Sequence, residues 1–271
     1  MKKKVFALLF AIVFCMGMLL TGCGSGSESE GTAEAEKTKL VIGTSSVCVD
    51  LANSGVEELE KMGYEVEIKV FDDYFLPNQA LVEGELDANL YQHEPFLNMY
   101  NDEKGTDIMM LEPQLWGYWS GFYSTKCDSV ETLPDGGLVG IAEDASNQDL
   151  DLRRMQEAGI IKLTDEEKEL YDIADIVENP HGYEFITADH TKYKNMDEYS
   201  FITGSSNTMA ADGIDPTENL IMRFDEEDLI HGMCILPENK DAQWVQDLMA
   251  AYTSDAAKAN VPESAGFYAN F

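Results

Sequence analysis

The chain has 271 residues, of which 44% are hydrophobic, and its formal net charge is −33 because 51 Asp and Glu residues outnumber 18 Lys and Arg residues. That length allows one large or two modest domains with hydrophobic cores of their own. The acidity argues against a nucleic-acid-binding protein and against a body that lies on an anionic membrane, since both surfaces are themselves negatively charged.

The first residues predict export and lipid anchoring. Three lysines precede an uncharged run over residues 5–20, which is the layout of a secretion signal and is short for a spanning helix. The ending Leu20-Thr21-Gly22-Cys23 resembles the bacterial lipobox, in which the cysteine is lipidated and becomes the mature N-terminus. We therefore expect a signal peptide over 1–22, a lipid such as palmitate on Cys23 and a location on the extracytoplasmic face of the cell membrane. The alternative is an ordinary signal or an uncleaved anchor.

Residues 23–37 are expected to be a flexible tether. The run GSGSESEGTAEAE has no large apolar side chain, so it cannot bury enough surface to offset the entropy of ordering. Beyond it the body carries three cysteines, Cys48, Cys127 and Cys234, without C-x-x-C or zinc-ligand spacing. We expect free or buried thiols in preference to a disulfide bridge.

The first part of the body alternates between strands and helices. Short apolar runs with strand periodicity are followed by runs of good helix formers that stop at glycine. We expect strands at 39–43, 65–71, 86–91 and 108–111, and helices at 49–61, from 76 to Gly84, and at 95–104. This order predicts a parallel or mixed sheet covered by helices.

The second part begins with an aromatic, glycine-bearing stretch at 116–124, which predicts a crossing strand. We then expect strands at 138–141, 172–177, 183–186, 200–203, 220–224 and 232–236, and helices at 148–158 and 241–252. Two α/β lobes explain the order: lobe 1 spans 38–124 and 224–271, lobe 2 spans 125–223, and two crossings near 118–126 and 219–226 join them. Such an architecture places a cleft between the lobes, where ligand binding is expected.

The stretch from Phe71 to Leu97 is the first candidate for a site. Aromatic and hydrogen-bonding side chains (Tyr74, Tyr91 and His93) occur where strands end and helices begin. In open α/β sheets, small ligands bind at that edge.

At several places the chain is similar to the NlpA/methionine-binding lipoproteins, the substrate-binding components of ABC importers. The matching segments are Asp73–Leu81 (DYFLPNQAL), Leu86–His93 (LDANLYQH), Phe122–Ser124, Asp144–Asn147 (DASN), Ala158–Leu163 and Val177–Pro180. The resemblance implies a two-lobed type II periplasmic-binding-protein fold with a ligand cleft, no enzymatic activity, and methionine or a relative as ligand. It further implies an ABC permease and its ATPase as partners of a protein that we expect to be a monomer.

By this resemblance, Tyr74, Tyr91 and His93 wall the apolar part of the ligand, where a thioether gains contacts with aromatic rings. The expected ligand-binding residues are Tyr74, Asn89, Tyr91, His93, Tyr118, Asn147, Ser205, Asn207 and His231. Core or edge packing is the alternative for the aromatic residues. For Asn78 and Asn89, helix caps or loop bonds are as plausible as ligand contact.

The second lobe departs from the family pattern. Members that hold an amino acid place an Arg after the Asp-x-x-Asn turn to pair with the ligand carboxylate, and here Leu150 occupies that place. Ser205 and His231 stand where the family has Asn. Arg154, one helical turn beyond Leu150, or the N–H groups near Asn147 could receive a carboxylate instead.

Functions of other classes find less support. The sequence has no G-x-S-x-G, H-E-x-x-H, P-loop or G-x-G-x-x-G motif, and its four histidines are dispersed, so we expect neither an enzyme, a cofactor nor a metal site. The alternatives are a metal-delivery lipoprotein, or the same fold with a ligand that is not an amino acid.

Overall fold

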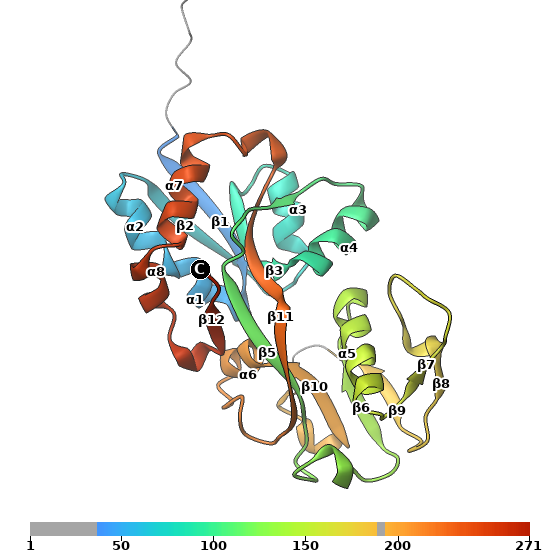
Figure 1. Ribbon diagram of the computed structural model, residues 1–271. Helices are drawn as coiled ribbons and strands as arrows, with labels where there is room; N and C mark the ends of the chain where they lie inside the picture. Colours follow the sequence, from blue (N-terminus) through green and yellow to red (C-terminus); the bar gives the residue numbers. More distant parts are fainter. Residues whose placement is uncertain (1–36, 189–192) are drawn as a thin grey trace, which may run out of the picture. The chain divides into compact units, whose positions relative to one another are not determined.

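The computed structural model describes residues 37–188 and 193–271, without the side chains of 226–228 (Figure 1). The predicted signal peptide 1–22, the lipidation residue Cys23 and all of the predicted tether except Lys37 lie outside the described residues.

Ten strands form one mixed sheet. They are β1 (Lys39–Ser45), β2 (Glu65–Phe71), β3 (Ala88–His93), β4 (Met109–Met110), β5 (Trp116–Tyr123), β6 (Leu138–Ile141), β9 (Glu184–Thr187), β10 (Phe201–Ser205), β11 (Leu220–Ile235) and β12 (Phe267–Ala269). The order is β2-β1-β3-β11-β5-β10-β6-β9, with β4 paired to β11 and β12 to β5. A second, two-stranded sheet pairs β7 (Lys162–Leu163) with β8 (Ile176–Glu178).

The sheet is parallel at its two ends and antiparallel in its middle. Strands β1, β2 and β3 run parallel to one another, as do β6, β9 and β10, whereas β5 and β11 pair antiparallel with their neighbours. The carboxyl ends of β1 and β3 therefore reach the same edge of the sheet, and so do those of β6 and β10.

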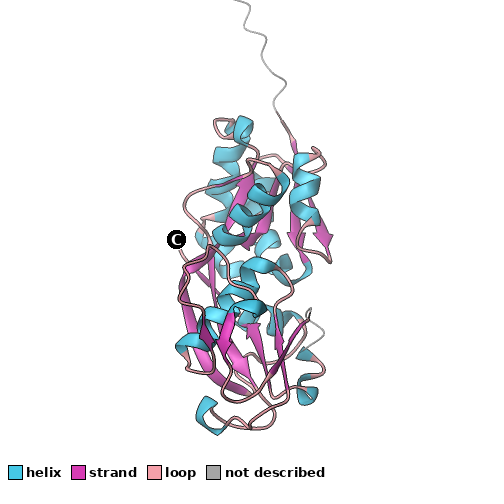
Figure 2. Ribbon diagram, turned by 90° about the vertical axis from the view of Figure 1, so that its right-hand side faces the viewer, coloured by secondary structure: helices cyan, strands magenta, loops and turns pink. Residues whose placement is uncertain are grey.

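Helices cover the first lobe on both faces of its sheet (Figures 1 and 2). The helices of this lobe are α1 (Val49–Ser54), α2 (Val56–Lys61), α3 (Leu76–Val82), α4 (Glu94–Lys104), α7 (Gln243–Tyr252) and α8 (Asp255–Asn260). Leu40 and Ile42 of β1 pack in one cluster with residues of α1, α2 and α7, while Leu81 and Leu97 belong to a second cluster formed by α3 and α4.

The second lobe has clusters of its own. Its helices are α5 (Ala145–Glu157) and α6 (Ser206–Ala211). Leu152 and Met155 of α5 pack against Val139, Ile141 and Phe201 of the sheet, and all five side chains are fully buried. Burying each such side chain stabilises the fold by about 1.5–3 kcal/mol.

Two strands connect the lobes. The stretch predicted to cross is β5, and the segments predicted as separate strands at 220–224 and 232–236 are both part of β11, whose pairing with β5 shifts register between Asp225 and Ile230. A Cβ atom on Gly121 would lie 2.6 Å from the Met222 carbonyl oxygen, so this position requires glycine for the two strands to pair. The predicted boundaries at 124 and 223 fall next to β5 and within β11, and as boundaries they remain a prediction.

Some local predictions were wrong. The helix expected over 49–61 is divided at Gly55, because the Tyr252 ring packs where a Cβ of Gly55 would lie and its hydroxyl donates to the Ala52 carbonyl. The strand expected at 172–177 begins instead as a 3-10 turn, Ile173–Asp175, closed by a capping box between Asp172 and Asp175. Helices α6 and α8 and strand β12 were not predicted.

The three cysteines of the body are free thiols, which confirms that prediction. Within 37–188 and 193–271, every helix is too short or too polar to cross a lipid bilayer.

Candidate ligand-binding site

A cavity of about 850 Å³ opens where the parallel strands of both lobes end. Ser45 at the end of β1, His93 at the end of β3 and Ser205 at the end of β10 line it, together with side chains from the crossing strands β5 and β11. Eight of the nine predicted ligand-binding residues lie around this cavity: Tyr74, Tyr91, His93, Tyr118, Asn147, Ser205, Asn207 and His231.

Asn89 does not line the cavity. Its side-chain nitrogen donates to Asn78 Oδ1 at 2.9 Å and its oxygen accepts from Gln92 Nε2 at 3.1 Å, all within the core. Opposite Tyr91 the pairing of β3 with β11 shifts register, so Asn89 and Gln92 point to one face although strand alternation would separate them. The amide network is therefore internal, and Asn89 is not retained among the proposed ligand-binding residues.

The first lobe presents an aromatic wall. Tyr91 donates its hydroxyl hydrogen to the Tyr74 carbonyl at 2.7 Å, and both rings lie edge-to-face with Phe96 at centroid distances of 6.2 and 6.3 Å. Burial raises the pKa of both tyrosines, so both remain neutral at physiological pH. The wall is a neutral, internally bonded surface against which an apolar ligand group can pack.

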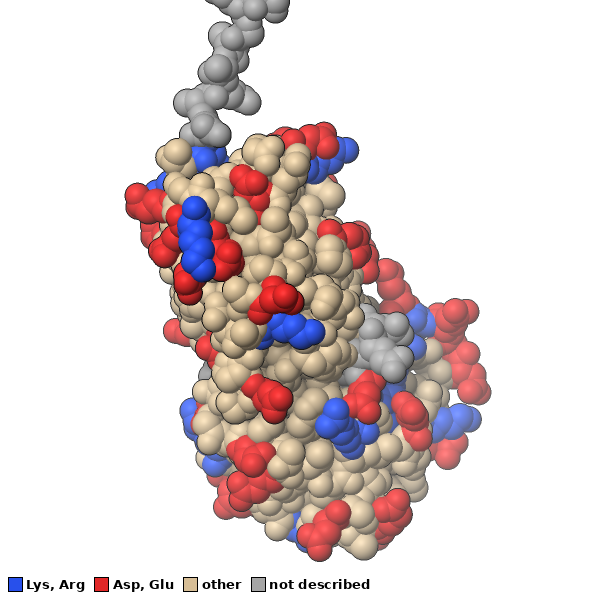
Figure 3. Space-filling view, turned by 60° about the vertical axis from the view of Figure 1, so that its left-hand side comes forward, with Lys and Arg blue, Asp and Glu red and all other residues tan. Residues whose placement is uncertain are grey.

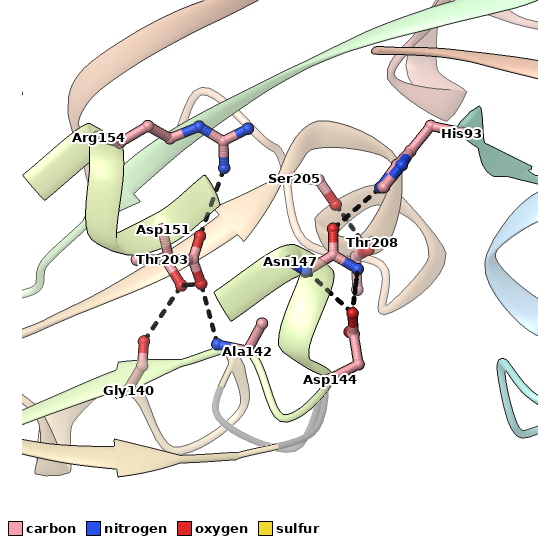
Figure 4. Close-up of polar contacts among 10 residues, drawn as sticks. All are labelled: His93, Gly140, Ala142, Asp144, Asn147, Asp151, Arg154, Thr203, Ser205 and Thr208. Atoms are coloured by element: carbon pink, nitrogen blue, oxygen red, sulfur yellow. Dashed lines mark hydrogen bonds and ion pairs between the residues drawn. The ribbon is translucent and has the colours of Figure 1, made fainter. Parts of the chain in front are cut away.

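His93 connects this wall to the second lobe (Figure 4). Its Nδ1 accepts from the Phe96 N–H at 3.2 Å, capping α4, and its Nε2 lies 3.1 Å from Asn147 Oδ1 on α5. Because Nδ1 is the acceptor, Nε2 carries the proton and donates to Asn147. Burial lowers the pKa of His93, which keeps the ring neutral in this arrangement.

The N-terminus of α5 is already occupied by a carboxylate of the chain itself. Asp144 is the N-cap, and its Oδ1 accepts from the Asn147 N–H at 2.9 Å while its Oδ2 accepts from Asn147 Nδ2 at 2.9 Å. We expected the N–H groups near Asn147 to be able to receive a ligand carboxylate, but the Asn147 N–H is bonded to Asp144 within the protein.

One turn along α5, a buried carboxylate holds the arginine that faces the cavity (Figure 4). Asp151 is 5% exposed, and its Oδ1 lies 3.3 Å from Arg154 Nη1. Its Oδ2 accepts from the Ala142 N–H at 2.9 Å and from Thr203 Oγ1 at 2.6 Å. Arg154 does line the cavity, as the sequence suggested, but it does so as half of an ion pair.

Leu150 contributes no polar group. It is half-buried and packs against the large apolar cluster of the first lobe, and it does not line the cavity. Asp149, beside it, is equally buried but pairs with Arg153 at 2.8 Å and accepts from the Tyr171 N–H, outside the cavity.

Several polar atoms of lining residues have no hydrogen-bond partner among the described residues. They are Ser45 Oγ, Asn207 Oδ1 and His231 Nδ1, on side chains that are 1%, 4% and 5% exposed. Burial, with the neighbouring His93 adding to the effect, lowers the pKa of His231 to about 3, so its ring is neutral and one ring nitrogen is an acceptor. Buried polar atoms without partners are costly, so a molecule that enters the cavity gains by hydrogen-bonding to these three.

Sequence reasoning did not identify Ser45, Asp151 or Thr203 as parts of the site. Ser45 is the last residue of an apolar strand and could have been found from that position. Asp151 and Thr203 are brought together only by the pairing of β6 with β10.

The described residues contain no group of three or more His, Cys, Asp or Glu side chains placed to hold a metal ion. On the face drawn in Figure 3, acidic side chains are spread over the surface and basic side chains lie beside them.

The fold and the cavity define a two-lobed α/β protein built to hold a small ligand between its lobes. The chain belongs to the NlpA lipoprotein family, whose model matches residues 40–268. This confirms the resemblance and the fold predicted from the sequence. Membership of a lipoprotein family also confirms the prediction of a lipid-anchored, extracytoplasmic protein.

Known relatives cover nearly the whole chain. The D-methionine-binding lipoprotein MetQ of Escherichia coli K12 is 30% identical over 94% of this chain and 92% of its own. A nutrient-binding protein from Burkholderia cenocepacia, solved bound to methionine, has a TM-score of 0.76 and 26% identity over 86% of this chain and 100% of its own. A lipoprotein of the YaeC family from Enterococcus faecalis has a TM-score of 0.74 and 25% identity over 87% of this chain and 100% of its own.

Proposed function

We propose that this protein is the substrate-binding lipoprotein of an ABC importer and captures a small amino-acid-like ligand, methionine or a relative, between its lobes. The observation that carries the proposal is the cavity itself, with an aromatic wall from one lobe and polar groups from the other. The relatives named for methionine binding support the ligand class.

The mechanism follows from the two connecting strands. A ligand that contacts both lobes favours a closed form over an open one, and the change occurs about β5 and β11. In our proposal the closed, monomeric protein docks on a membrane permease, and an ATPase drives the release of the ligand. No catalytic step is required of this chain.

A ligand screen tests the proposal. The full-length protein, purified in detergent, is heated with L- and D-amino acids, methionine derivatives, vitamins and divalent metals. A ligand present at about 100 times its dissociation constant stabilises the folded state by about 2.7 kcal/mol, which raises the melting temperature measurably. Stabilisation by zinc alone would support a metal-delivery lipoprotein instead, and stabilisation by a vitamin alone would support a ligand that is not an amino acid.

Matched asparagine variants locate the binding site. Asn207→Ala removes a lining side chain whose oxygen has no partner in the described part of the chain, so we expect it to abolish the ligand-induced shift. Asn101→Ala removes bonds to Thr106 and Ile108 away from the cavity, so it lowers the melting temperature but leaves the shift in place. An unchanged shift in Asn207→Ala would place the ligand elsewhere.

A further inference from the structure

The charges that line the cavity are strongly one-sided. Among the residues that the structure describes, six carboxylates and one guanidinium line it, namely Asp72, Asp73, Glu103, Glu143, Asp144 and Asp151 against Arg154. That guanidinium is 3.3 Å from the buried Asp151 carboxylate, which compensates its charge within the protein. The cavity therefore lies in a negative field, and focusing by its walls makes such a field favour cations.

Each of the two usual anchors for a ligand carboxylate already has a carboxylate of the protein beside it. A carboxylate in this fold could bind the N–H groups at the start of α5 or the guanidinium of Arg154. Asp144 caps the first, and Asp151 pairs with the second. A second carboxylate at either place would lie next to one that the protein already supplies, and like charges repel.

Acceptors, in contrast, are available in the cavity. Among the described residues, Asn207 Oδ1 and His231 Nδ1 have no hydrogen-bond partner, and both side chains are more than nine-tenths buried. The His231 ring is neutral, so one of its nitrogens is an acceptor. Atoms of this kind accept hydrogen bonds from an ammonium group, which brings three donors.

We propose that the cavity binds a cationic amine whose carboxyl end is uncharged, as in an amino-acid amide, in preference to the free amino acid. This inference deepens the proposed function and rests on it. The volume of about 850 Å³ lies toward the upper end of the range for small-molecule sites, so it has room for a substituent on the carboxyl carbon.

Three compounds with one side chain test the charge preference. L-methionine is a zwitterion, L-methioninamide is a cation and N-acetyl-L-methionine is an anion, and each is titrated calorimetrically into the full-length protein in detergent. We expect the amide to bind at least about tenfold more tightly than methionine, the factor typical of one charge-assisted hydrogen bond. We expect no binding of the N-acetyl compound.

Two substitutions should weaken the preference for the amide. Asp151→Asn removes the charge that compensates Arg154 yet keeps an oxygen that accepts from the Ala142 N–H. Asp144→Asn removes the charge at the start of α5, and Asn caps helices as well as Asp does. Each variant should narrow the preference for the amide by about tenfold. Asp149→Asn is the matched control: this carboxylate is equally buried and paired on the same helix but does not line the cavity, so the preference should persist.

The outcomes separate the two proposals. If methionine binds as tightly as its amide or more tightly, the inference is wrong while the proposed function stands. If none of the three compounds binds and no other amino-acid derivative stabilises the protein, both are wrong. If Asp149→Asn changes the preference as much as Asp151→Asn and Asp144→Asn do, charge next to the cavity does not set the specificity, and the inference is wrong.

Discussion

The two walls of the cavity are built on different principles. The first-lobe wall is neutral, and its aromatic side chains are fixed by edge-to-face contacts and by the bond from Tyr91 to the Tyr74 carbonyl. The second-lobe wall holds charges, Asp144, Asp151 and Arg154, each tied to a neighbour on or near α5. An apolar wall accepts many ligands of similar size, whereas a charged wall selects between protonation states and end groups. In our interpretation, affinity therefore comes mainly from the first lobe and specificity from the second.

The largest effect on stability should come from the charged wall. Asp151→Ala removes the carboxylate that pairs with Arg154, whose side chain is only 13% exposed, and takes away the acceptor of the Ala142 N–H. Breaking a buried ion pair from one side costs about 3–5 kcal/mol. Urea denaturation of the variant should show that loss. Asp149→Ala is the comparison: Arg153 is 46% exposed and turns to water, so the loss should be clearly smaller. Equal losses would mean that burial of the arginine is not what matters.

Because His231 of the first lobe is buried and neutral, the free energy of unfolding should depend on pH. The pKa of His231 in the folded protein, about 3, is below its usual value of about 6.5 in an unfolded chain. The unfolded state therefore binds more protons between these values, so the stability that His231 permits is present above pH 6.5 and is lost as the pH falls. The loss should reach about 1.4 kcal/mol per pH unit, or about 2.7 kcal/mol by pH 4.5. Urea denaturation of wild type and His231→Gln across this range isolates the contribution, since the other titrating groups are common to both. If the free energies of unfolding of the two proteins fall equally with pH, His231 makes no such contribution.

The buried amide network behind the aromatic wall should matter for stability and not for ligand contact. Asn89→Ala leaves polar atoms of Asn78 and Gln92 short of partners, which costs about 1–3 kcal/mol. Ligand affinity, measured at a temperature where the variant is folded, should change little because Asn89 does not line the cavity. If the substitution lowers the free energy of ligand binding much more than the free energy of unfolding, Asn89 contacts the ligand after all.

The two walls also differ in how far the sequence alone predicts their residues. Tyr91, His93 and Asn147 were identified because each stands at a strand end or a helix start, and such positions are local patterns. Asn89 was expected at the cavity but does not line it, because the register shift opposite Tyr91 depends on pairing with β11, more than 130 residues away in the chain. The pairing of Asp151 with Thr203 depends likewise on β6 and β10 lying side by side. Local signals therefore sufficed for the first wall, while the charged contacts of the second required the tertiary structure.

The smallest effect should come from the bond that joins the two walls. Asn147→Ala removes the acceptor of the His93 Nε2–H and the Nδ2–H that donates to Asp144. Because Asp144 is half-buried and can bond to water instead, the cost should be about 1 kcal/mol, the typical net contribution of a neutral hydrogen bond. Asn179→Ala, which removes bonds to Tyr183 within the second lobe, is a control of similar size. Only the first variant breaks a contact between the lobes, so only it should favour the open form and widen the distance between spin labels placed on α3 and on β8. If both variants leave that distance unchanged, the bond between His93 and Asn147 adds stability without holding the two walls together, and closure depends on the ligand alone.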